Sequence, residues 1–237
     1  MFNEWTEEQK EELINGFWTG LFTIYKLPVF LYDFTLTNYV GAFTEAEAVN
    51  YLNTYLNELQ YMAADKTASQ MLDFQRLLIQ NGSRITRAEF LEVAIKLDDK
   101  YNIQYLATEY NTTIAQAQSV RDWNNFDKKL LKYRTVEDPN VRHSHAELNG
   151  IIRPKDDPFW NTYAPLNGWN CRCYLQELDA GNITDVEKLD KKSINEGVPS
   201  EFRNNPATSG KLWKGGNVYS DQITKRQKKS VEKLVNG

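Results

Sequence analysis

Residues 130–150 have the sequence LLKYRTVEDPNVRHSHAELNG, and within this stretch a helical pattern gives way to a mixed one. Residues 130–136 are rich in side chains that favour a pleated surface, so they predict a strand. Asp138 followed by Pro139 is typical of a helix N-cap with proline at the first helical position. Asn149-Gly150 is typical of a helix end. We therefore expect a strand and then a helix of about ten residues.

Short strands and long loops are expected downstream of this stretch. Residues 151–153 and 171–178 predict strands, and residues 221–235 predict a closing helix. Between the two strands, residues 154–170 hold three prolines, a glycine and four large aromatic side chains, with neither a helical nor a strand period. A loop of that length is uncommon in a compact domain unless its function or some anchor fixes it.

Upstream, residues 3–126 follow a helical pattern with a single proline. Thr44 predicts the N-cap of one helix, residues 71–78 predict a helical stretch that stops at Asn81-Gly82, and Thr86 with Glu89 has the spacing of a capping box. The longest helix is expected at 101–126. Its apolar stripe, which we interpret as core, consists of Ile103, Leu106, Tyr110, Ile114, Ala117, Val120 and Trp123.

The predicted fold class is therefore α+β, with a mainly helical part at 1–127 followed by a small α+β domain with short strands at 128–237. The first part carries 9 basic and 18 acidic residues, net −9, whereas the second carries 19 and 14, net +5. The two parts either face different surroundings or neutralise each other across an internal contact.

The composition of the 237 residues, 41% hydrophobic and 25% charged, is that of an ordinary soluble globular protein. Two cysteines cannot supply a disulfide framework, and the N-terminus lacks a signal-peptide profile, so we expect a cytoplasmic, reduced chain. The most apolar neighbourhood, residues 17–43, is interrupted by charges and a proline and is too short to span a bilayer.

Both histidines and both cysteines lie between His143 and Cys173. In a strand, Cys171 and Cys173 present their sulfurs on one side. In a helix, His143 and His145 point nearly opposite ways, so at most one should join the thiols. This set supplies three of the four ligands of tetrahedral zinc. The fourth ligand could come from water or from a further side chain: Asp138, Asp156, Asp157 or the other histidine.

A Cys-x-Cys pair departs from the usual zinc spacing, which places two or more residues between paired cysteines. The alternative is that two buried thiols pack as small apolar groups beside a hydrogen-bonded histidine. The sequence contains no phosphate-binding loop, nucleophile elbow, His-Glu-x-x-His helix or dinucleotide-binding turn. An enzyme is therefore the less favoured class.

The closing helix carries a cluster of positive charges, Lys225, Arg226, Lys228, Lys229 and Lys233. Such a cluster could contact nucleic-acid phosphates, or it could be a solvated helix end. Because the whole chain is acidic, a dedicated sequence-specific DNA-binding protein is not expected.

Several motifs occur in one order: YRTVEDPNVRHSHAELNG at 133–150, PKDDPFW at 154–160 and NGWNCRC at 167–173. This set closely resembles the phage Mu F-like head morphogenesis family, also called minor head or minor capsid proteins, over residues 84–215. His143 departs from the family pattern, so His145 is the histidine expected to face the thiols. The resemblance maps the family motif onto Arg134, Asp138, Arg142, His145, Gly150, Cys171, Arg172 and Cys173.

The resemblance implies a virion component of a tailed bacteriophage or prophage, made in the host cytoplasm and located at the portal vertex and capsid interior. It would assist head assembly and, in some phages, enter the host with the DNA. The expected partners are the portal protein, the major capsid or scaffold proteins, and packaged DNA through Lys225, Arg226, Lys228 and Lys229. Apart from the resemblance, the candidate cofactor is a structural zinc ion at His145, Cys171 and Cys173, and two packed thiols without a metal ion are the favoured alternative.

Two other hypotheses stay open at this point. One is a metal-dependent hydrolase or nuclease, or a toxin-like effector, delivered with the phage genome. The other is a packaging accessory that contacts DNA through residues 225–233. The family lends no settled enzymatic activity, and the 27 residues after Gly210 are too few for an appended toxin domain.

Overall fold

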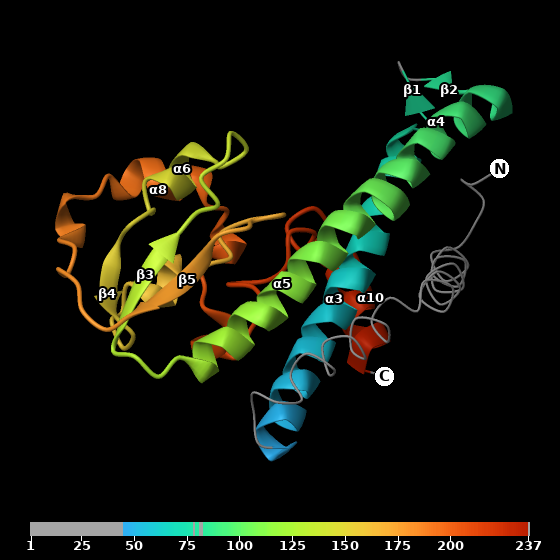
Figure 1. Cartoon of the computed structure of the whole chain (residues 1–237). Helices are drawn as coiled ribbons and strands as arrows, with labels where there is room; N and C mark the ends of the chain where they lie inside the picture. Colours follow the sequence, from blue (N-terminus) through green and yellow to red (C-terminus); the bar gives the residue numbers. More distant parts are fainter. Residues whose placement is uncertain (1–44, 78, 81–82, 237) are drawn as a thin grey trace. The chain divides into compact units, whose positions relative to one another are not determined.

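The computed structural model describes residues 45–77, 79–80 and 83–236 (Figure 1). These residues combine long helices with a small antiparallel sheet, which confirms the predicted α+β class. They form two compact units. One comprises Leu59–Asn102 and residues 218–236, and the other comprises residues 45–58 and Ile103–Asn217. Thr44, Asn81 and Gly82, which the sequence marks as helix boundaries, lie outside the described residues.

The first long helix, α3 (Glu45–Leu77), is continuous where the sequence pattern suggested two separate stretches. A two-stranded hairpin of β1 (Ile79–Gln80) and β2 (Ser83–Arg84) follows it. Helix α4 (Arg87–Asp99) begins at the predicted capping box. The Thr86 N–H donates to the Glu89 carboxylate at 2.8 Å, and the Glu89 N–H donates to Thr86 Oγ1 at 3.3 Å.

The predicted helix at 101–126 is the later part of a longer helical run. The π-helical segment η2 (Lys100–Tyr105) follows α4 directly and leads into α5 (Leu106–Asn125). Of the predicted apolar stripe, Val120 is buried and Trp123 is partly buried, while the side chains of the other five members lie outside what is described. The buried face of α5 also carries polar side chains that the stripe did not predict: Glu109, Thr112, Thr113 and Gln116.

The sheet has the order β4-β3-β5 and is antiparallel throughout (Figure 1). Its strands are β3 (Leu130–Arg134), β4 (Ile152–Pro154) and β5 (Tyr174–Leu178). Each predicted strand exists: β3 and β5 are shorter than predicted, and β4 is shifted by one residue. In β3, Leu131 and Tyr133 are buried while their neighbours are partly exposed, as strand alternation requires.

The helix expected after β3 is much shorter than its sequence signals suggested. Helix α6 spans only His143–Ala146 and starts after Arg142, so the N-cap prediction at Asp138 is wrong. The Asp138 carboxylate instead accepts a hydrogen bond from the Asn140 N–H at 3.0 Å, a local turn that competes with helix formation. The predicted end at Asn149-Gly150 is also wrong, because α6 ends at Ala146 and residues 147–150 form a turn in which Gly150 has a left-handed φ of 87°.

Small helical elements fill the remaining connections. They are α7 (Trp160–Tyr163), η3 (Val186–Lys188), α8 (Lys191–Gly197), η4 (Ser200–Phe202) and α9 (Pro206–Ser209). The aromatic segment 154–170 proves to be anchored in the core. Trp160 is fully buried, and its Nε1–H donates to the Pro154 carbonyl at 2.8 Å. Cys171 and Cys173 belong to the same core cluster.

The closing helix α10 (Lys225–Asn236) begins four residues later than predicted. Thr224 precedes it as a cap, because its N–H donates to Gln227 Oε1 at 2.9 Å and its Oγ1 accepts from the Gln227 N–H. Val231 of α10 packs with Ala64 and Ala68 of α3. Across the part of the chain that the structure describes, every helix is too short or too polar to cross a membrane.

A partly buried carboxyl gives the fold a testable pH dependence. Glu58 of α3 accepts hydrogen bonds from the backbone N–H groups of Leu212 and Trp213, yet burial raises its pKa from 4.5 to about 7. A raised carboxyl pKa stabilises the fold fully below the unfolded value, and this stabilisation disappears as the pH rises through 7. Since one pKa unit is worth about 1.4 kcal/mol, we expect the free energy of unfolding to fall by about 1–3 kcal/mol between pH 4.5 and 8.

Urea denaturation at several pH values measures this effect. Glu58→Gln keeps an oxygen acceptor but cannot ionise, so its unfolding free energy should vary much less over the same range. Glu92→Gln, at an exposed position of α4, is the matched control and should keep the wild-type pH profile. A Glu58→Gln profile as steep as that of the wild type would contradict the assignment.

Candidate functional site

Three of the sequence-predicted residues come together in the unit that contains the sheet. His145 lies on α6, and Cys171 and Cys173 lie in the extended segment just before β5. The His145 Nδ1 atom is 3.6 Å from Cys171 Sγ and 3.7 Å from Cys173 Sγ. All three residues are buried. His143 points elsewhere, with its Nδ1 2.9 Å from Glu147 Oε1, so only one histidine faces the thiols.

The orientation of the imidazole is fixed from its far side. Nε2 of His145 lies 3.2 Å from the carbonyl oxygen of Asn167, which can only accept, so the Nε2–H donates there and Nδ1 faces the sulfurs. Asn167 is fully buried, and its side chain accepts from the Tyr133 hydroxyl at 2.8 Å and donates to the Ala164 carbonyl at 3.2 Å. Asn167 and Tyr133 were not among the predicted site residues. Asn167 does open the NGWNCRC motif, which could have indicated it.

The two thiols affect each other's ionisation. A hydrogen bond with Cys173 lowers the pKa of Cys171, an effect that burial opposes and His145 reinforces. The same hydrogen bond, together with burial, raises the pKa of Cys173. The pair therefore favours one thiolate that accepts a hydrogen bond from the remaining thiol. A bound metal ion would instead be ligated by both sulfurs as thiolates.

None of the side chains considered as a fourth ligand joins this cluster. The Asp138 carboxylate binds the Arg172 guanidinium at 2.6 and 2.9 Å, and this contact lowers the pKa of Asp138. Asp157 binds Arg153, and Asp156 lines a cavity that does not include His145, Cys171 or Cys173. Among the described residues, the group that could hold a metal ion consists of His145, Cys171 and Cys173.

The remaining residues of the predicted family motif fix the loops around the cluster. Arg142 donates to the Trp169 carbonyl at 2.6 Å and so holds the segment that leads into Cys171. Arg172 holds Asp138, and Arg134 forms an ion pair with Glu137 at 3.2 Å. Gly150 supplies the left-handed turn between α6 and β4. These four residues position the backbone and do not contribute ligand atoms.

The predicted cationic residues of α10 project into solvent. Lys225, Arg226, Lys228 and Lys229 are exposed, while Val231 on the opposite side of the helix is buried. Lys228 lies 3.9 Å from Asp221, a weak exposed pair. The helix therefore presents a positively charged face that nucleic-acid phosphates could contact.

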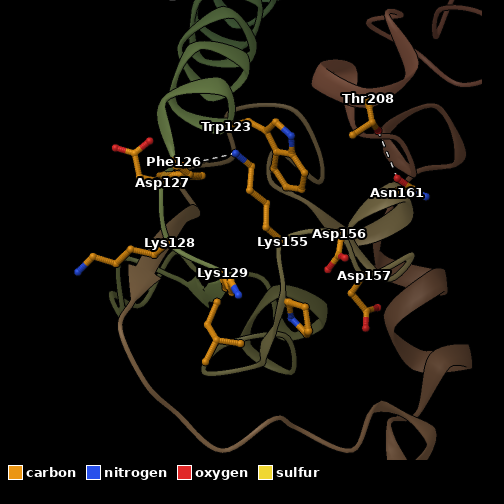
Figure 2. A pocket seen from close by; sticks show the side chains of 12 residues that line it. Trp123, Phe126, Asp127, Lys128, Lys129, Lys155, Asp156, Asp157, Asn161 and Thr208 are labelled. Carbon is orange, nitrogen blue, oxygen red and sulfur yellow. Dashed lines mark hydrogen bonds between the residues drawn. The ribbon is translucent and has the colours of Figure 1, made fainter.

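The same unit also contains a cavity of about 790 Å³ that was not predicted from the sequence (Figure 2). Lys155 crosses it from one wall, donating from Nζ to the Phe126 carbonyl at 2.7 Å and lying 6.0 Å from the centre of the Trp123 ring. On another side, Thr208 Oγ1 donates to Asn161 Oδ1 at 3.3 Å. Its lining contains neither histidine nor cysteine, and it shares no residue with the cluster at His145. The cavity offers charged and aromatic surface without a paired nucleophile and base.

Comparison with known proteins agrees with the motif order. Residues 75–176 match the family described as Phage Mu protein F like protein. A segment of 86 residues is 40% identical to protein F of Escherichia phage Mu, whose name assigns it to capsid assembly, and covers 34% of this chain and 20% of that protein. A segment of 74 residues is 36% identical to the Mu-like prophage FluMu F protein of Haemophilus influenzae, covering 31% and 18%.

The chain thus spans about a fifth of the length of these two relatives. No solved structure matches it. The matched segment includes the sheet strands β3 and β4, helix α6 and both cysteines, so it contains the whole candidate site. The resemblance predicted from the sequence motifs is confirmed over this segment.

Proposed function

We propose, from the premise that residues 75–176 make this chain a Mu F-like protein, that it acts in the assembly of a phage head. The observation that carries the proposal is the family match, together with 40% identity to a segment of phage Mu protein F. The chain would be a minor head protein of a tailed bacteriophage or prophage, present in the virion.

We place the protein at the portal vertex and capsid interior, with the portal protein and the major capsid or scaffold proteins as partners. The charge distribution supports two contact surfaces of different kinds, since residues 1–127 carry a net charge of −9 and residues 128–237 a net charge of +5. The acidic helical part would dock to the head proteins. The basic residues would face packaged DNA, above all those of α10, which belongs to the same compact unit as residues 59–102, and the chain would leave the capsid with the DNA.

The proposed role is assembly rather than catalysis. The cavity that reaches His145, Cys171 and Cys173 has a volume of about 20 Å³, which is too small for a nucleotide or peptide substrate. The groups around it, Arg142 and Arg172, are occupied in holding Trp169 and Asp138. The cluster is therefore better suited to fixing the fold of the domain than to turning over a macromolecular substrate.

A test of head assembly compares particles made with and without this chain. Virions from a host in which the gene is interrupted should be fewer or defective, and supplying the full chain in trans should restore them. Mass spectrometry of purified wild-type virions should detect the chain at low copy number relative to the major capsid protein. Its absence from virions, with normal particle yield from the interrupted gene, would overturn the proposal.

The DNA-facing role of α10 predicts a strong salt dependence. Each phosphate neutralised by a lysine or arginine contributes about −0.9 to the slope of log affinity against log salt for duplex DNA. Replacing Lys225, Arg226, Lys228 and Lys229 by glutamine should therefore flatten the slope by up to about 3–4 and weaken binding at low salt. Fluorescence anisotropy with a labelled duplex and the full chain measures both quantities.

The matched control removes the same charge from a different surface. Lys188, Lys191, Lys192 and Lys214 are exposed in the other unit, and glutamine at all four should change the slope much less. Equal losses in the two variants would mean that net charge alone drives binding, which would contradict a specific role for α10.

A further inference from the structure

The nitrogen–sulfur distances among His145, Cys171 and Cys173 match those of a tetrahedral zinc site, and the three ligand atoms all lie within 4.8 Å of one another. With Zn–S bonds of about 2.3 Å and a Zn–N bond of about 2.1 Å, a tetrahedral angle places nitrogen and sulfur about 3.6 Å apart. The two observed distances from Nδ1 to the sulfurs are 3.6 and 3.7 Å. Both sulfurs therefore already lie at the separation from one ring nitrogen that a shared metal ion requires.

The support behind the histidine is that of a metal ligand. Metal-binding imidazoles commonly donate their second ring N–H to a carbonyl or carboxylate, which fixes the ring and directs the other nitrogen at the metal. Here Nε2 faces the Asn167 carbonyl at 3.2 Å, and Asn167 is itself held by Tyr133 from the middle strand. The imidazole of His145 is thus held in a ligand orientation by Asn167, and Asn167 is held in turn by Tyr133.

The charges also balance at this position. Two thiolates neutralise a divalent cation, so the occupied site would carry no net charge in an environment where an unpaired ion is costly. Thiolate sulfur with imidazole nitrogen is a donor set that suits zinc, whereas calcium and magnesium prefer oxygen.

A small cavity borders the three candidate ligands. The cavity is lined by the three candidate ligands together with Arg142, Asn170 and Arg172 and neighbouring residues, and its volume is about 20 Å³. A water molecule needs about 10–15 Å³ by the same measure, so the space accommodates one. Asp138, Asp157 and His143 are held by other partners, and Asp156 lines the separate cavity of Figure 2, which leaves the fourth position to solvent.

We propose that His145, Cys171 and Cys173 bind one zinc ion whose fourth ligand is a water molecule in this cavity. The ion links α6, which follows the middle strand β3, to the extended segment that leads into β5. It therefore holds these two connecting segments together. The site follows from the ligand geometry alone and does not depend on a role in phage heads. A failed virion assay would leave it intact, and a metal-free protein would leave the assembly proposal intact.

Metal analysis and cobalt substitution of the full chain test the proposal. Protein purified under reducing conditions should contain about one zinc per chain. Replacing zinc with cobalt(II) should give thiolate-to-cobalt charge-transfer bands and the strong visible bands of a four-coordinate ion. Adding azide should shift the visible bands, because an open position exchanges its water. A folded chain that takes up neither metal, or that carries a Cys171–Cys173 disulfide, would overturn the site.

Variants locate the metal on these residues. His145→Ala and Cys173→Ser should lower zinc affinity by about 100-fold or more in a competition with a chromogenic chelator, since second-shell changes alone cost about 10–100-fold. His143→Ala is the matched control, because it lies on the same helix with its side chain exposed and should keep the wild-type affinity. If Cys173→Ser does not fold, the cobalt spectrum of the wild-type chain still decides whether thiolates bind the ion. Cobalt bands unchanged by azide would overturn the solvent ligand.

Discussion

Replacing Trp160 by alanine is expected to lower the free energy of unfolding by about 3–5 kcal/mol. Trp160 is fully buried and packs edge to face against Phe159, with ring centres 5.1 Å apart. Its N–H donates to the Pro154 carbonyl at 2.8 Å, and Pro154 pairs with Leu130 in the sheet. The truncation therefore opens a cavity and removes one of the two hydrogen bonds at the partly buried Pro154 carbonyl, which still accepts from the Asp157 N–H at 3.1 Å. Urea denaturation followed by circular dichroism measures the loss.

Two further variants separate the contributions to this effect. Trp160→Phe keeps much of the ring volume but removes the donor, so it should cost about 1–2 kcal/mol. Ile183→Ala, at a position that is 55% exposed, should change stability by less than about 0.5 kcal/mol. If Trp160→Ala were no more destabilising than Ile183→Ala, the aromatic segment would not be part of the core.

The anchored role of Trp160 also shows where sequence patterns stop being informative. Residues 154–170 have no helical or strand period, because Phe159, Trp160 and Tyr163 enter the core from a single turn of helix and its flanks. Periodicity reports burial only when the backbone repeats regularly over several residues. The aromatic content correctly indicated that something anchors the loop, but not that the loop itself supplies core side chains.

Local signals predicted local structure well. The capping box at Thr86 and Glu89 formed as expected, since both partners lie within one helical turn. The N-cap expected at Asp138 did not form, because its carboxylate accepts from the nearby Asn140 N–H and also binds Arg172, 34 residues away. The burial of polar residues on α5 could not be predicted from local patterns either, because their partners are distant in the sequence. Thr112, for example, accepts a hydrogen bond from the backbone of Asn170, 58 residues further on.

The candidate site likewise has some features that local sequence patterns predict and others that depend on long-range contacts. The spacing of the cysteines and the opposite directions of His143 and His145 gave three residues that the structure brings together, with the sulfurs within 4 Å of one ring nitrogen. The orienting carbonyl of Asn167 and the small cavity at the fourth position depend on how the loop folds, so no local pattern encodes them. Of the four side chains considered as further ligands, Asp138, Asp157 and His143 are held by other partners, and Asp156 lines a separate cavity.

Gly197→Ala is the second change for which a large loss of stability is expected. Gly197 is the last residue of α8, which packs against α6 (Figure 1). A Cβ atom at position 197 would overlap both the Oγ and the Cβ of Ser144, which is buried on α6. Neither atom is the end of a flexible side chain, so the helices would have to separate. We expect a loss of about 2–4 kcal/mol, comparable with severe overpacking in other cores.

A double-mutant cycle identifies this overlap as the cause. Ser144→Gly removes both clashing atoms and should by itself cost about 1 kcal/mol, the helix penalty of glycine. Combined with Gly197→Ala, it should recover most of the loss, giving a coupling energy of about 1–3 kcal/mol. Additive effects would mean that the backbone at 197, and not the contact with Ser144, requires glycine.

Because His145 follows Ser144, separation of α6 from α8 also moves the imidazole. Gly197→Ala should therefore weaken zinc binding, and the double variant should restore it.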